Sequence, residues 1–132
     1  MRQPLNELRQ FMPNSERAAL LQSLAGEERS FFVTMLLELA DRVLGMPITY
    51  QQQNVADPIV YLHYFKNGCD WYITEKDCDP DNEGQHQAFG WANLGDDDNA
   101  EFGYISIPEL CACGVELDLY WQVRPLSEIR GS

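Results

Sequence analysis

The spacing of the apolar residues changes near residue 47, and this change constrains the fold more than any other feature of the chain. Between residues 27 and 44 the apolar residues recur at steps of three and four, the spacing of one helix face: Phe32, Met35, Leu36, Leu39 and Val43. Gly45 and Pro47 then end the helical region, because glycine favours the position after a helix and proline cannot continue one. An earlier helix is predicted from residue 14, where the run Asn14-Ser15-Glu16 supplies an N-cap and an acidic first turn.

After residue 50 the pattern becomes that of strands. Residues 59–65 and 71–74 flank a short turn that contains Asn67 and Gly68, which predicts a β-hairpin. Further strands are predicted at residues 88–93, 102–107 and 117–123, and short helical turns at 108–110 and 125–129. Helices followed by a run of strands predict an α+β fold rather than alternating βα units.

The expected architecture is an N-terminal segment of two or three helices packed on a mainly antiparallel sheet of about five strands. The helical segment covers residues 1–47 and the β-rich domain residues 48–132. A chain of 132 residues has room for one domain of ordinary size, so the two parts are expected to form one compact unit.

Acidic residues outnumber basic ones by 21 to 9, which gives a formal net charge of −12. Residues 51–132 hold 15 of the acids and 4 of the bases, a net charge of −11. Two clusters in predicted loops dominate, and we expect both to project from one edge of the sheet: Glu75, Asp77, Asp79, Asp81 and Glu83, then Asp96, Asp97 and Asp98. Such a surface repels phosphate groups, so direct nucleic-acid binding and docking on anionic lipid are disfavoured.

The N-terminal residues lack the apolar core of a secretory signal peptide. The most apolar run, residues 31–40, is much shorter than the ~20 apolar residues of a membrane span. We therefore expect a cytoplasmic protein that neither crosses nor binds a membrane. Free thiols are expected at its four cysteines because the cytosol is reducing: Cys69, Cys78, Cys111 and Cys113.

Several motifs of the β-rich domain occur together in a known family. They are residues 71–77 (WYITEKD), 88–90 (AFG), 103–110 (GYISIPEL) and 115–120 (VELDLY), followed by residues 125–126 (PL). Over about residues 46–129 the chain resembles an uncharacterised family of domains of unknown function, small acidic proteins carried by bacterial plasmids, integrative conjugative elements and phages. The resemblance implies a mobile element that lives among host defences, and it implies no established activity.

The candidate metal and catalytic sites have weak sequence signals. Residues 77–81 begin like a calcium loop, but position six is Asn82 and position twelve is Ala88, where such a loop needs Gly and Glu. The pair Cys111 and Cys113 lacks the usual zinc-ligand spacing. We therefore expect no metal, no cofactor and no catalytic residue, although a carboxylate- and metal-dependent hydrolase remains the less favoured alternative.

Neither histidine belongs to a catalytic motif. His63 is expected to be partly buried and hydrogen-bonded in its strand, where it shares a face with Tyr61 and Phe65. His86 lies in a polar stretch and is expected to be exposed.

The favoured hypothesis is a non-enzymatic inhibitor encoded by a mobile element. Its acidic edge would occupy a basic nucleic-acid-binding surface on a host defence protein, as an anti-CRISPR or antirestriction protein does. Exposed tryptophans beside the acidic loops would serve as anchors. The predicted partner-binding residues are Glu75, Asp77, Asp79, Asp81, Glu83, Asp96, Asp97, Asp98, Glu101, Trp71 and Trp91.

The alternative hypothesis is an accessory module in plasmid or conjugative-element DNA metabolism. It would bind another element-encoded protein through an aromatic and helical surface. A homodimer that pairs through the Phe31–Phe32 helix is also left open by the sequence.

Overall fold

The computed structural model describes residues 11–13, 29–48, 56–76 and 87–129. Within them the chain forms one long helix, α3 (Arg29–Gly45), two sheets, and the short helices α4 (Ile107–Ala112) and α5 (Leu126–Ile129). The helix predicted from residue 14 lies outside the described residues. A long N-terminal helix followed by a mainly antiparallel sheet confirms the predicted α+β class.

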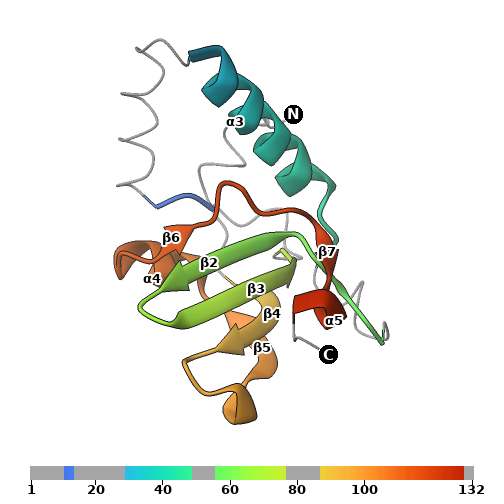
Figure 1. Ribbon diagram of the computed structural model, residues 1–132, viewed down its shortest axis with the longest axis vertical. Coiled ribbons are helices and arrows are strands. Elements are labelled where there is room, and N and C mark those ends of the chain that lie inside the picture. Colours follow the sequence, from blue (N-terminus) through green and yellow to red (C-terminus); the bar gives the residue numbers. More distant parts are fainter. Residues whose placement is uncertain (1–10, 14–28, 49–55, 77–86, 130–132) are drawn as a thin grey trace.

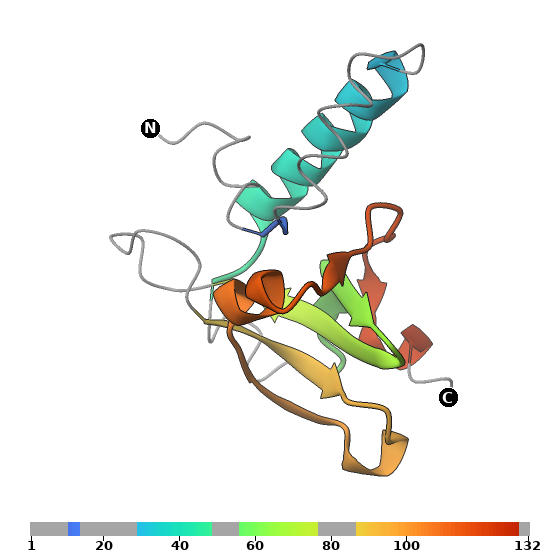
Figure 2. The ribbon, with the colours of Figure 1, turned by 90° about the vertical axis from the view of Figure 1, so that its left-hand side faces the viewer.

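The larger sheet has five strands in the order β5-β4-β3-β2-β6, and every neighbouring pair is antiparallel. The strands are β2 (Leu62–Lys66), β3 (Cys69–Glu75), β4 (Ala88–Asn93), β5 (Glu101–Ile105) and β6 (Glu116–Leu117). Strands β2 to β5 follow one another along the chain and pair in turn, whereas β6 returns to pair with β2. Helix α3 lies toward the β6 and β2 side, and β5 is the edge farthest from α3 (Figures 1 and 2).

Helix α3 packs on the core through the face that the spacing predicted. Its buried residues are Met35, Leu39, Ala40 and Val43, and Phe32 and Leu36 are partly buried against the same core. At its C-terminal end the Lys76 ammonium donates hydrogen bonds to the carbonyls of Val43 and Leu44, at 2.9 and 3.1 Å. A cation at this position also offsets the partial negative charge of the helix end, so Lys76 joins α3 to the end of β3.

The predicted hairpin is present as β2 and β3. Lys66 pairs with Cys69, which leaves Asn67 and Gly68 as a two-residue turn. Both turn residues have positive φ angles, 49° and 84°, as a type I′ turn requires. The Asn-Gly pair thus sets the register of the β2–β3 hairpin.

Alternate residues of the strands form an inner face that carries the main core. This face is continuous with the buried side of α3, and Ile107 and Leu110 of α4 join it. Its fully or largely buried strand residues are Leu62, Tyr64, Ile73, Ala88, Ile105 and Leu117. The Tyr64 hydroxyl donates to the carbonyl of Phe11, so the short segment 11–13 is also fixed to this core.

Strand β4 contains Gly90 at a position where no larger residue fits. A Cβ atom at this position would lie 2.0 Å from the carbonyl oxygen of Tyr72, which belongs to the backbone of β3. The register of β3 and β4 shifts between Ile73 and Glu75 beside it. Close approach of two backbones at a bulge is a common reason for glycine in a strand.

The strand predicted at residues 102–107 is β5, Glu101–Ile105, and it ends earlier than expected. Ile107 instead begins α4, because Ser106 is its N-cap and accepts the amide of Glu109 at 3.3 Å. Pro108 lies in the first turn, where its missing N–H is tolerated. The predicted helical turn at 108–110 is thereby confirmed as part of α4.

The prediction of a strand at residues 117–123 is wrong beyond Leu117. The Asp118 carboxylate accepts the amide of Tyr120 at 3.0 Å, and the Asp118 carbonyl accepts the amide of Trp121 at 3.3 Å. Local bonds of this kind compete with a strand ladder for the same amides. The chain therefore turns away from the sheet after the two residues of β6.

A second, smaller cluster lies beside the main core. Strand β1 (Ile59–Val60) pairs with β7 (Arg124–Pro125), so the predicted strand 59–65 is divided at Tyr61. Buried Val60, Trp121 and Leu126 fill this cluster. Helix α5 confirms the predicted helical turn at residues 125–129.

None of the described helices has the length and apolarity of a membrane-spanning segment.

Candidate binding surface on the outer face of the sheet

Opposite the inner face, the sheet carries a row of aromatic residues. The strand register places His63 opposite Tyr72, Tyr72 opposite Trp91, and Trp91 opposite Phe102. Side chains of directly paired residues lie on the same face of a sheet. We call these four residues the outer row; it crosses β2, β3, β4 and β5.

The half of this face on β4 and β5 is an aromatic patch. We define the β4–β5 patch as Phe89, Trp91, Phe102 and Tyr104. The Trp91 and Phe102 rings meet edge to face with centroids 4.9 Å apart, and Phe89 contacts Phe102 at 6.0 Å and Tyr104 at 5.6 Å. Phe102 is 41% exposed and Tyr104 is 53% exposed. Contiguous exposed aromatic area of this kind is typical of interaction sites.

The other half of the outer row is organised around His63. Its Nε2 lies 2.7 Å from Oδ1 of Asp70, and its Nδ1 lies 3.1 Å from Oδ2 of Asp118. Both hydrogen bonds form at once when the ring carries a proton on each nitrogen. The ring also stacks on Tyr72 with centroids 4.8 Å apart. The expectation that His63 is partly buried and hydrogen-bonded is confirmed, and both its nitrogens are engaged in tying β2 to β3 and to Asp118.

Trp121 covers the His63 half of the outer row. Its ring lies 5.1 Å from His63 and 5.8 Å from Tyr72, and its indole N–H donates to the carbonyl of Val60 at 3.1 Å. The guanidinium carbon of Arg124 stands 4.5 Å from the centre of the same ring, within cation–π range. Trp121 thus closes one half of the row, whereas Phe102 and Tyr104 leave the other half exposed.

An open hollow of about 530 Å³ lies between α3 and residues 119–122. Its walls include Glu38 and Arg42 of α3 together with Tyr120 and Trp121. The buried Nη1 of Arg42 has no hydrogen-bond partner among the described residues. Burial lowers the pKa of Arg42, and the nearby carboxylates of Glu38 and Asp118 oppose this effect. Because both charges line the hollow, its walls favour neither an anion nor a cation.

The acidic residues of the β4–β5 connection lie beside the β4–β5 patch. The Asp96 carboxylate accepts the amide of Asp98 at 3.0 Å and the side-chain amide of Asn99, which closes the turn into the 3₁₀-helix Asp97–Asn99. Asp96, Asp98 and Glu101 are exposed. Asp96 and Asp98 therefore lie in the connection beside the patch. Glu101 alternates with Phe102 along β5, so it points to the opposite face of the sheet.

Glu75, the acidic residue at the end of β3, is buried, whereas the sequence predicted it to be exposed in a loop. Glu75 belongs to β3 and is only 2% exposed, so it is not available to a partner. Asp77, Asp79, Asp81 and Glu83 lie outside the described residues. In addition, β3 ends and β4 begins at the end of the sheet opposite the 94–100 connection. The expectation of a single acidic edge rests on residues 77–83 as well, which lie outside the described ranges, so it stays a prediction.

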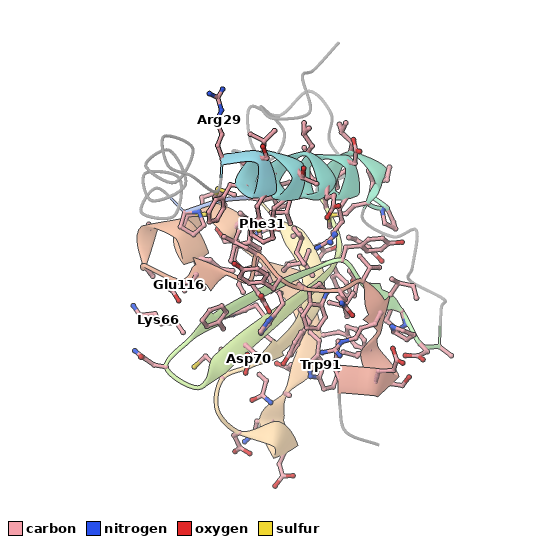
Figure 3. All side chains as sticks on the ribbon, turned by 45° about the horizontal axis from the view of Figure 1, so that its top comes forward. Arg29, Phe31, Lys66, Asp70, Trp91 and Glu116 are labelled. Carbon is pink, nitrogen blue, oxygen red and sulfur yellow. The ribbon has the colours of Figure 1, made fainter. Side chains whose placement is uncertain are left out.

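The two predicted tryptophan anchors point to opposite faces. Trp91 belongs to the outer row, whereas Trp71 pairs with Tyr64 and packs against the main core. Both are partly buried. Figure 3 labels Trp91 on β4 and Asp70 on the neighbouring strand β3. Of the two, Trp91 adjoins the exposed rings.

Among the described residues, Cys69, Cys111 and Cys113 form no disulfide bond. Cys78 lies outside the described residues, as does His86. In the part of the chain that the structure describes, no three His, Cys, Asp or Glu side chains gather closely enough to hold a metal ion.

Sequence reasoning missed Asp70, Asp118 and Phe102 as parts of the outer face. A signal for Phe102 was present, because Phe89 and Trp91, like Phe102 and Tyr104, are two residues apart and so share one face of a strand. No local signal pairs Asp118 with His63, since these residues are 55 positions apart.

We compared the chain with protein-family models, with curated proteins and with solved structures, and none of them matches it.

Proposed function

We propose that the chain is a non-enzymatic binding protein that docks on a basic surface of a protein partner. The β4–β5 patch and the carboxylates of Asp96 and Asp98, in the connection next to it, form the contact. The observation that carries this proposal is the exposure of Phe102 and Tyr104 next to clustered carboxylates, on a chain of net charge −12.

The chemistry of this surface favours lysine and arginine side chains. Aromatic rings attract cations through their π faces, and carboxylates attract them by charge. Residues 87–105 contain no lysine or arginine, so no cation of this segment competes for the contact. Aromatic platforms that stack nucleic-acid bases come with a basic groove; this segment carries acids instead, which repel phosphate.

The biological partner that we propose is a host defence protein. In the mobile-element setting that the family resemblance implies, a CRISPR effector or a restriction enzyme offers a basic nucleic-acid-binding surface in the cytoplasm. A protein that occupies this surface blocks access of the nucleic acid. The attraction speeds association and weakens with salt, because it acts between charges.

A second candidate is the accessory module in plasmid or conjugative-element DNA metabolism. Helix α3 favours it, because Leu37 and Leu44 are 50% and 41% exposed, and Phe31, beside the hollow, is 52% exposed. Such a module would bind an element-encoded protein through apolar area. Its binding would then depend little on the loop carboxylates.

A charge-reversal experiment tests the proposal. The triple variant Asp96→Lys, Asp97→Lys, Asp98→Lys is compared with Glu109→Lys, Glu116→Lys, Glu128→Lys, which changes the net charge equally at exposed positions elsewhere. Each protein is produced in hosts that carry one restriction or CRISPR system, and phage plating efficiency is measured. We expect the chain to raise plating, the first triple variant to lose this effect, and the second to keep it.

Several results would contradict the proposal. Retained inhibition by the first triple variant shows that the loop carboxylates are not the contact, and equal loss in both shows an effect of total charge alone. If the chain raises plating in no host, inhibition of these defences is excluded. Co-purification of an element-encoded protein that survives loop reversal but is lost in Leu37→Ser, Leu44→Ser would instead favour the accessory module.

A further inference from the structure

Strand β5 is an edge of the five-stranded sheet: it pairs with β4, and no described strand pairs with it on the side away from β4. It is five residues long and lies at the edge farthest from α3 (Figures 1 and 2). Its outer-face residues Phe102 and Tyr104 are exposed. An edge strand presents backbone N–H and C=O groups that can pair with another chain.

The opposite edge is constructed differently. Strand β6 has only two residues, and the turn at Asp118 takes the chain away from the sheet directly after it. Short edge strands of this kind protect a sheet from further pairing. Strand β5 is longer and contains neither lysine nor proline, the residues that most often protect an edge.

Gly103 lies at the centre of β5, on its inner face. A Cβ atom at Gly103 would have no neighbour within 4 Å, so the inner side of β5 is open at its centre. On the outer face of the sheet, the side chains of an added strand would lie next to Phe102 and Tyr104 and extend their row. The aromatic surface then supplies contacts for alternate residues of the added strand, as in other cases of strand addition.

Charge selects the occupant of this edge. Glu101 begins β5, and Asp96 and Asp98 lie in the connection just before it, so the entry to the edge is negative. A second copy of the chain would bring another −12 and the same carboxylates to this edge, which disfavours β5–β5 pairing. An extended segment with lysine or arginine at alternate positions complements both the carboxylates and the exposed rings.

We infer that β5 binds an extended basic segment of the protein partner by adding it to the sheet as a sixth strand. This inference rests on the proposed function, since it takes the same basic partner and specifies how the contact is made. Backbone hydrogen bonds along β5 supply affinity, and the rings of Phe102 and Tyr104 together with the carboxylates supply the preference for cationic side chains.

The test uses the full chain and a synthetic peptide of about eight residues that alternates lysine and valine, a length that matches an ordinary strand. A matched peptide carries N-methyl groups along one edge, which removes backbone donors and keeps the charge. We expect the unmodified peptide to slow amide hydrogen exchange in residues 101–105 and to bind at least about 10-fold more tightly than the methylated one, as the loss of several hydrogen bonds requires.

Three results would overturn the inference. Equal affinity of the two peptides shows that the side chains bind without strand addition. Failure of the peptide to bind at millimolar concentration excludes a basic strand at this edge. Slowed exchange at residues 101–105 in the chain alone as its concentration rises, with a dimer by size-exclusion chromatography, assigns the edge to a second copy.

The proposed function is judged separately. If the methylated and unmodified peptides bind equally, while the Asp96–Asp98 reversal still abolishes inhibition of a defence system, strand addition is wrong and the basic partner stands. If the reversal leaves inhibition unchanged, the proposed function fails, whatever the peptides do.

Discussion

The two faces of the five-stranded sheet are formed by alternate residues of the same strands, yet they have different chemistry. On β2, Leu62 and Tyr64 point to the inner face and are fully buried, whereas His63 and Phe65 point outward. The inner face packs on α3 and α4 as continuous apolar core. On the outer face, Trp121 covers the part around His63, whereas Phe102 and Tyr104 are exposed. We therefore expect stability to depend mainly on the inner face, and the proposed contact to use the exposed part of the outer face.

The strongest test of this contrast compares two substitutions on one strand. Leu62→Ala removes a fully buried side chain, and we expect it to lower the free energy of unfolding by ~2–5 kcal/mol. Phe65→Ala removes a ring that is 37% exposed and stacks on His63, for which we expect a loss of about 1 kcal/mol. Urea denaturation measures both. Equal losses would show that the outer face contributes as much to stability as the core.

A smaller effect is expected from the carboxylate that joins the turn after β6 to the outer row. Asp118→Ala removes the acceptor of His63 and of the Tyr120 amide, and we expect a loss of ~1–3 kcal/mol. Because this turn positions Trp121, the NMR resonance of its indole N–H should exchange with solvent faster. Asp118→Asn keeps an oxygen acceptor and serves as the matched control, with a smaller loss. Unchanged indole exchange in Asp118→Ala would contradict the role of Asp118.

The smallest effect concerns the tie between α5 and the segment before β1. Hydrogen bonds from the hydroxyl and amide of Ser127 hold the pKa of Asp57 below its usual range. A lowered pKa in the folded state means that this contribution is complete above the pKa of the unfolded chain, ~3.9, and is lost as the pH falls through the lower folded value.

We therefore expect the carboxyl carbon of Asp57 to titrate at lower pH in the wild-type chain than in Ser127→Ala, as followed by NMR. The amide resonance of residue 127 should move with the same midpoint in the wild type. Coincident titration curves of Asp57 in the two proteins would show that Ser127 does not stabilise the carboxylate.

Local signals in the sequence were sufficient for most of the elements. The three- and four-residue spacing located α3, the Asn67-Gly68 turn located the β2–β3 hairpin, and Pro108 marked the helical turn that is part of α4. Each of these signals involves only a few consecutive residues, so it can be recognised in the sequence without knowing which elements pack nearby.

The errors occurred where distant residues decide the outcome. Leu117, Leu119 and Trp121 alternate as a strand does, but the turn at Asp118 and the contact of Trp121 with Val60 take the chain away from the sheet. The sequence predicts that Glu75 is the first acidic residue of a loop. In the structure it lies after the register shift, at the end of β3, and is buried.

For the candidate surface, the sequence identified the acids of the β4–β5 connection and Trp91, and these lie together. It did not separate Trp91 from Trp71, because only the register of β3 and β4 shows that they face opposite sides. It also did not show which half of the outer row stays exposed, since Trp121 reaches the other half from another part of the chain.

The strand order also has a consequence for how the chain folds. Strands β2 to β5 form by joining neighbours, whereas β6 pairs Leu117 with Tyr64 across 53 positions. Closing a longer loop costs more chain entropy, and distant pairings slow folding. We therefore expect the hairpins to form early and β6 to dock late. The hydrogen bond between His63 and Asp118 would then be among the last native contacts to form, and so a marker of completed folding.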